Sequence, residues 1–150
     1  MNKKKIDAHS FLNPDEEKQV LEAIGQAELN TSGEIRVHLE TECKKEVLAR
    51  AKEVFHHLKM HKTKLRNGVL FYVATESKHF AILGDQGINE KVELTFWDST
   101  KDLVLHHFKQ GERALGLALG IHKAGEKLKT FFPYQQNDQN ELSDEISTGE

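Results

Sequence analysis

The sequence contains little that could cross-link the chain, anchor it or export it. One cysteine, Cys43, occurs in 150 residues, which excludes an intramolecular disulfide framework and a cysteine-rich zinc site. The apolar stretches, such as residues 69–74, are far shorter than the about 18 residues that a membrane span needs. Residues 1–5 are basic, but the apolar segment of an export signal does not follow them. We therefore expect a cytoplasmic protein without a membrane span.

An excess of charge of one sign is also lacking. The chain has 21 Lys and Arg residues against 24 Asp and Glu residues, a net charge of -3. Five of the acids, but no Lys or Arg, lie in residues 134–150, so the rest of the chain has 21 basic and 19 acidic residues. This near balance gives no electrostatic basis for binding nucleic acid. We expect an N-terminal extension over residues 1–10, one domain over 11–133 and an acidic, disordered tail over 134–150.

Within the domain, apolar residues recur with helical and strand periods in turn. Helical spacing predicts helices over about 14–29, 44–60, 93–109 and 112–130, the first capped by Asn13 with Pro14 as its first residue. Period two predicts a strand over 34–41, buried on one face and near a sheet edge. The apolar run 69–74 predicts a central strand, and 80–83 should return beside it as a hairpin. This order predicts a small α/β sandwich whose mixed sheet contains a parallel crossover and an antiparallel hairpin.

This topology brings acidic residues together. The starts of the first two strands and the end of the third should share one sheet edge, where Glu34, Asn67 and Asp85 lie, and Asp98 can reach it from the following helix. We call these four residues the acidic edge. Carboxylate and amide oxygens favour a hard divalent cation, which predicts a Ca²⁺ or Mg²⁺ site. The pattern alone also allows a simpler interpretation, in which Asp85 caps a turn and Glu34 and Asp98 are solvated.

Five short motifs, in order, resemble those of the TPM domain family over about residues 11–133. They are Ser32-Gly33-Glu34-Ile35, Arg66-Asn67-Gly68-Val69-Leu70, Gly84-Asp85-Gln86-Gly87-Ile88, Phe96-Trp97-Asp98, and Phe108-Lys109-Gln110-Gly111 with Gly116. Residues 138–142 are also similar to the ending of stand-alone bacterial members. The resemblance implies a three-layer α/β/α sandwich that binds divalent cations, with metal ligands at Glu34, Asp85 and Asp98. It also implies a phosphatase activity, which is attributed to a plant thylakoid-lumen member.

Other signals for catalysis are weak. Cys43 lacks the phosphate-binding loop of cysteine phosphatases, and the nine histidines include no His-Glu-x-x-His pattern. Many members of the family are exported or carry a transmembrane segment, and neither feature is found in this sequence. We therefore expect a stand-alone domain that binds a divalent cation as a binding or regulatory module. The alternatives are a weak metal-dependent phosphatase that uses the acidic edge, with Arg66 or Arg36 contacting phosphate, and a scaffold whose acidic tail recruits a protein partner.

Overall fold

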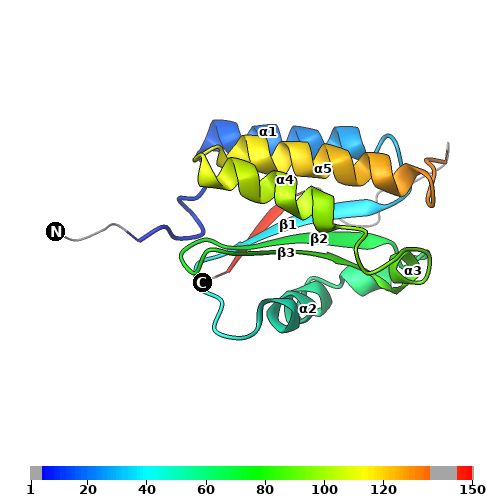
Figure 1. Cartoon of the computed structure of the whole chain (residues 1–150), viewed down its shortest axis with the longest axis horizontal. Coiled ribbons are helices and arrows are strands. Elements are labelled where there is room, and N and C mark those ends of the chain that lie inside the picture. Colours follow the sequence, from blue (N-terminus) through cyan, green and yellow to red (C-terminus); the bar gives the residue numbers. More distant parts are fainter. Residues whose placement is uncertain (1–4, 136–144, 150) are drawn as a thin grey trace.

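A four-stranded mixed sheet lies between two layers of helices (Figure 1). The computed structural model describes residues 5–135 and 145–149. The strands are β1 (Glu34–Glu40), β2 (Gly68–Ala74), β3 (His79–Gly84) and β4 (Ile146–Gly149). The helices are α1 (Pro14–Ala27), α2 (Val47–His57), the 3₁₀ turn η1 (Met60–Lys62), α3 (Gln86–Asn89), α4 (Asp98–Lys109) and α5 (Arg113–Lys129). Helices α1, α4 and α5 cover one face of the sheet and α2 covers the other, which confirms the α/β/α sandwich.

The sheet has the order β3-β2-β1-β4. Strand β1 runs parallel to β2, and β2 pairs with β3 in an antiparallel hairpin, as the sequence predicts. Strand β4 was not expected, because residues 134–150 were predicted to be a disordered tail. Residues 146–149 instead pair in parallel with β1, and the tail residues 136–144 and 150 lie outside the described residues.

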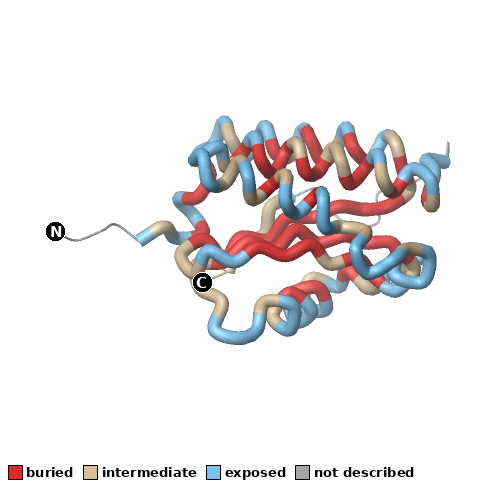
Figure 2. The backbone as a smooth tube through the Cα atoms, viewed as in Figure 1, coloured by how far each residue is buried: buried red, intermediate tan, exposed pale blue. Residues whose placement is uncertain are grey.

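Strand β1 is therefore an interior strand, and the prediction that it is buried on one face near a sheet edge is wrong. All seven of its residues are buried, as the continuous red course of the central strands shows (Figure 2). Polar and apolar residues alternate along β1, so the polar residues lie on one face of the strand and the apolar residues on the other, and both faces are covered. Two of its polar residues, Glu40 and His38, find partners on α2 and β4, as described below.

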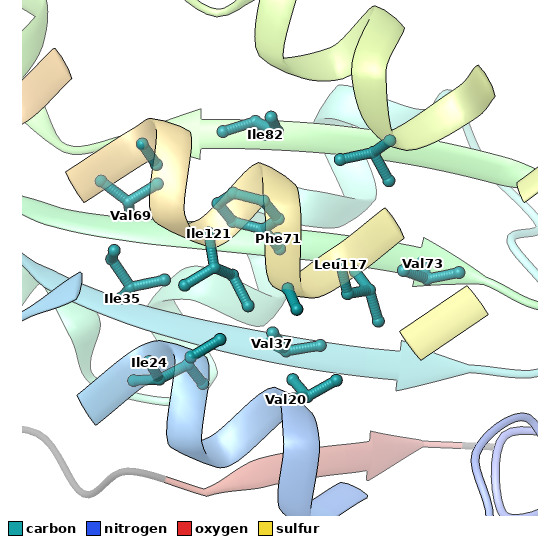
Figure 3. Packing of buried hydrophobic residues seen from close by; sticks show 14 of the residues in the cluster. Val20, Ile24, Ile35, Val37, Val69, Phe71, Val73, Ile82, Leu117 and Ile121 are labelled. Atoms are coloured by element: carbon teal, nitrogen blue, oxygen red, sulfur yellow. The ribbon is translucent and has the colours of Figure 1, made fainter. Parts of the chain in front are cut away.

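The core has two parts, one on each face of the sheet. The larger part packs the sheet residues Ile35, Val37 and Phe71 against Ile24 of α1 and Ile121 of α5 (Figure 3). The smaller part, under α2, contains Val54, Phe55, Met60, Leu70 and Tyr72. Because both faces of the sheet are buried, functional side chains are confined to its two ends and to the layer under α2.

The start of α1 confirms the predicted cap. The Asn13 side chain accepts a hydrogen bond from the Glu16 amide at 2.8 Å, and the Glu16 carboxylate accepts one from the Asn13 amide at 2.9 Å. This reciprocal pair satisfies two amides that a helix start otherwise leaves without partners. Residues 93–97, which were predicted to be helical, precede α4, which begins at Asp98. In the described part of the chain, no helix combines the length and the hydropathy that crossing a membrane requires.

Candidate functional site

The backbone brings Glu34, Asn67 and Asp85 to the same end of the sheet. The Glu34 amide donates to the Asn67 carbonyl at 3.3 Å, and the Asp85 amide donates to the Gly68 carbonyl at 2.9 Å. Glu34 and Asp85 therefore flank the start of β2 from opposite sides, as the topology predicted. Both carboxylates are buried, with 5% and 6% of the residue exposed, and Asn67 is 2% exposed.

The Asp85 carboxylate is paired with the side chain of Arg66. The Arg66 guanidinium donates to both of its carboxylate oxygens, through Nε at 2.8 Å and Nη2 at 3.0 Å. The Gln86 amide donates to Asp85 Oδ1 at 2.7 Å, because Asp85 also caps the short helix α3. The hydrogen bond from Arg66 to Asp85 raises the pKa of the guanidinium. Sequence reasoning considered Arg66 only as a phosphate contact. Its place just before β2, beside the strand that ends one residue before Asp85, makes this pair geometrically accessible.

The loop that carries Arg66 has an unusual backbone. Arg66 has φ 50°, a left-handed conformation that a side chain other than glycine rarely adopts. Its carbonyl accepts a hydrogen bond from the Gly87 amide at 2.8 Å. A Cβ on Gly87 would lie 2.6 Å from that same oxygen, so only glycine allows α3 to approach the loop this closely. Such strain persists only where surrounding contacts hold it, which is common at binding sites.

Asp98 lies apart from this pair. It is the exposed first residue of α4, and its charge acts on Lys127 of α5. Lys127 donates to the Phe96 carbonyl and lies 4.4 Å from the centre of the Phe96 ring. Burial lowers the pKa of Lys127 and Lys123 lowers it further, whereas Asp98 acts in the opposite direction. Over residues 5–135 and 145–149, no three His, Cys, Asp or Glu side chains are grouped so as to hold a metal ion.

A second polar cluster, under α2, was missed by the sequence analysis. Glu40 of β1 is 2% exposed and accepts hydrogen bonds from Arg50 Nε at 2.9 Å and Arg50 Nη2 at 2.6 Å. The Tyr72 hydroxyl donates to the same carboxylate at 2.5 Å. Burial acts to raise the pKa of Glu40, but the hydrogen bonds from Arg50 and Tyr72 outweigh it, so the net shift is downward. Burial and the bond to Glu40 also raise the pKa of Tyr72.

The cluster continues through His38 to the C-terminal strand. His38 Nδ1 lies 2.8 Å from Ser147 Oγ of β4, and Nε2 lies 3.5 Å from Glu40 Oε1. Burial lowers the pKa of His38, and Glu40 opposes this shift. A cavity of about 830 Å³ opens beside the cluster. Arg50 and Tyr72 engage the Glu40 carboxylate, and His38 contacts Ser147, so the cluster ties α2 and β4 to the sheet.

The sequence contained one signal for this cluster. Arg36, His38 and Glu40 lie on the same side of β1, and Arg50 follows on the next helix. A row of acidic and basic residues on one side of a strand can form ion pairs inside the protein, or it can face the solvent. The period of the strand does not distinguish these two cases.

Residues 5–127 match the TPM domain among protein families. The chain belongs to the TPM domain family. This TPM domain is also similar to the NMR structure of the BA42 protein from the psychrophilic bacterium Bizionia argentinensis. The two chains share 52% sequence identity with a TM-score of 0.88, over 93% of this chain and 96% of that chain. Comparison with curated proteins gives no match. The TPM match begins at residue 5, so it includes part of the segment that we predicted to be an N-terminal extension.

Proposed function

We propose that this TPM domain is a cytoplasmic binding or regulatory module that takes up a divalent cation, Ca²⁺ or Mg²⁺, at its acidic edge. The observation that carries the proposal is the position of Glu34 and Asp85 on either side of the start of β2. Two carboxylates and the Asn67 amide group offer the oxygen ligands that hard cations prefer. Family membership also supports it, since the family's acidic positions fall on Glu34, Asp85 and Asp98.

Arg66 determines how well these residues fit a cation. Its guanidinium takes both oxygens of Asp85, so the described conformation offers that carboxylate to no second cation. We propose that the metal ion replaces Arg66 as the partner of Asp85. Arg66 is partly exposed, with 42% of its side chain accessible, so it can move into solvent without leaving a buried charge behind. For Asp98 to join as a third acidic ligand, the start of α4 would have to approach Asp85, because the described residues group no three acids around one point.

A calcium and magnesium titration of the wild type and three variants tests the proposal. Amide chemical shifts and melting temperature are followed in the wild type, Asp85→Asn, Arg66→Asn and Asp102→Asn. Asparagine is chosen at position 66 because it tolerates φ above zero. We expect shifts at residues 33–35, 66–68, 84–90 and 96–99, and loss of binding in Asp85→Asn. Arg66→Asn should bind the metal more tightly, because the guanidinium that competes for Asp85 is removed. Asp102 is an exposed acid on α4 outside the acidic edge, so its replacement should leave binding unchanged.

Two outcomes would contradict this function. The first is the absence of any shift at millimolar metal in the wild type. The second is equal binding in the wild type and Asp85→Asn, which would place the cation elsewhere. Weaker rather than tighter binding in Arg66→Asn would show that Arg66 does not compete with the metal.

A weak metal-dependent phosphatase is the second candidate, favoured by the guanidinium beside the acidic edge. Arg66 released from Asp85 would be available to a phosphoryl oxygen, and stabilising charge on such oxygens is a main requirement of phosphate ester hydrolysis. Hydrolysis of para-nitrophenyl phosphate with Mg²⁺ tests it. We expect both Asp85→Asn and Arg66→Asn to abolish the activity. A rate that is unchanged in Asp85→Asn would contradict the mechanism.

Recruitment of a protein partner by the acidic tail remains a separate proposal. Deleting residues 134–150 does not test the tail alone, since it would also remove β4 from the sheet. Neutralising Asp138, Glu141 and Asp144 by amide substitution tests the charge of the tail while keeping residues 145–149. Loss of a captured partner in this variant, with an unchanged melting temperature, would support the proposal.

A further inference from the structure

The opposite end of the sheet holds a cavity that none of the proposals above uses. It lies where β2 ends and β3 begins, against the end of α4, the start of α5 and the segment before α1. Its volume is about 410 Å³, within the about 300–1,000 Å³ that is usual for small-molecule sites. The acidic edge lies at the start of β2, so the two places are separated by the length of that strand.

The interior of the cavity is apolar and fixed. Phe11, Val73 and Phe80 are buried, and Phe108 meets Phe11 and Phe80 edge to face with ring centres 5.7 Å apart in both pairs. Edge-to-face contacts of this kind hold aromatic rings in one orientation. The N-terminal segment closes one side, where the Thr75 hydroxyl donates to the Ile6 carbonyl at 2.5 Å. The apolar lining is therefore part of the folded domain.

The ionisable residues that line the cavity are all basic types. They are Lys78, His79, Lys109 and Arg113, and we call the cavity with these residues the cationic pocket. In the described part of the chain, no ion pair engages any of the four.

The acids nearest in sequence to the pocket are occupied elsewhere. Glu112 pairs with His107 at 2.9 Å, and Glu76 accepts a hydrogen bond from the Ile6 amide at 2.7 Å. Asp7, next to Ile6, accepts one from the Ser10 amide at 2.8 Å. Arg113 is also fixed, since it donates to the Phe11 carbonyl at 3.3 Å and lies 4.8 Å from the centre of the Phe11 ring. Among the described residues, the basic side chains beside this apolar interior have no carboxylate partner. Such a pocket is complementary to a ligand with an apolar body and one anionic head.

We propose that the cationic pocket binds a small amphipathic anion, with a short acyl or aromatic body against Phe80 and Phe108 and an anionic head near Lys78, Lys109 and Arg113. Carboxylates and phosphate monoesters share this chemistry. The proposal does not depend on metal binding, because the pocket shares no residue with the acidic edge.

Calorimetry and amide chemical shifts with a matched set of eight-carbon compounds test the proposal. Octanoate and octyl phosphate carry the two anionic heads, octanol carries no charge, and octylamine carries a positive one. We expect one or both anions to bind, with shifts centred on residues 73–80 and 105–113, and we expect octanol and octylamine to bind at least about fivefold more weakly. The better of the two anions identifies the head group. Octylamine or octanol binding as tightly as both anions would overturn the proposal, as would shifts centred elsewhere.

Two variants and one control separate the contributions of charge and shape. The double variant Lys78→Asn, Lys109→Gln removes two basic side chains and should weaken the preferred anion about fivefold. Leu105 also lines the cavity, so Leu105→Trp should fill it and abolish binding. Lys101→Gln changes an exposed lysine of α4 outside the pocket and should leave affinity unchanged. Equal affinity in the double variant and in Lys101→Gln would overturn the role of the basic residues, and melting temperatures establish that each variant is folded.

Discussion

Gly120 of α5 is the position at which adding one methyl group should be most informative. Helix α5 packs closely on α4 and the sheet there, because a Cβ at position 120 would overlap Val104 Cγ2 and lie 3.2 Å from Phe71 Cε2. Both neighbours are fully buried, and valine has little rotamer freedom in a helix. Overpacking costs about 1–3 kcal/mol, and the severe overlap with Val104 places this site in the upper part of that range, about 2–3 kcal/mol. The higher helix propensity of alanine returns about 1 kcal/mol. We therefore expect Gly120→Ala to lower the free energy of unfolding by about 1–2 kcal/mol.

The same substitution at Gly25 of α1 provides the matched control. A Cβ at that position would meet nothing within 4 Å. Gly25→Ala should therefore stabilise the protein by about 0.5–1 kcal/mol through helix propensity alone. Urea unfolding followed by circular dichroism measures both variants, with an unchanged dependence on urea as the sign that the unfolded state is unaffected. A Gly120→Ala variant as stable as the wild type would refute the argument that α5 approaches its neighbours too closely for a side chain.

Three further predictions concern hydrogen bonds and protons. Tyr72→Phe should cost about 1–3 kcal/mol in urea unfolding, because the buried Glu40 carboxylate loses the hydroxyl that donates to it; a loss below 0.5 kcal/mol would contradict this. Asn13→Ala should cost about 1 kcal/mol by removing the cap of α1, whereas Asn13→Ser should be near neutral, and equal losses would argue against capping. The pKa of His38 is lowered in the folded state, so the unfolded state binds its proton first and stability should fall as pH drops below about 6.5. His38→Gln should flatten this part of the stability profile, and a profile identical to that of the wild type would exclude His38 as its cause.

Local sequence signals predicted most of the fold. The capping residues Asn13 and Glu16 define the start of α1, and the apolar run of β2 fits a strand covered on both faces. The pairing of β4 with β1 could not be predicted in the same way. It joins residues 109 positions apart, and a four-residue strand has no period long enough to recognise. The misplaced start of α4 has a local cause, since residues 93–97 contain apolar residues at spacings compatible with a helix.

The candidate site was predictable only as far as the backbone determines it. Strand direction was sufficient to place Glu34 and Asp85 at the same end of the sheet. The pairing of Asp85 with Arg66 depends on the loop before β2. In that loop Arg66 has a left-handed backbone conformation, and its guanidinium lies at the Asp85 carboxylate. Side-chain pairing of this kind follows from tertiary geometry, which neither composition nor period encodes.

The pairing of β4 with β1 also has a consequence for synthesis of the chain. The ribosome completes β3 and both flanking helix layers before it reaches residues 146–149, so the growing domain passes through a three-stranded stage. During that stage the outer backbone groups of β1 have no neighbouring strand, and such an edge can pair with another chain. Arg36 and His38 lie along this strand, and charged or polar side chains on an edge disfavour such pairing. We therefore expect Arg36 and His38, which contact Glu145 and Ser147 in the folded domain, to disfavour pairing with another chain while residues 146–149 are not yet in place.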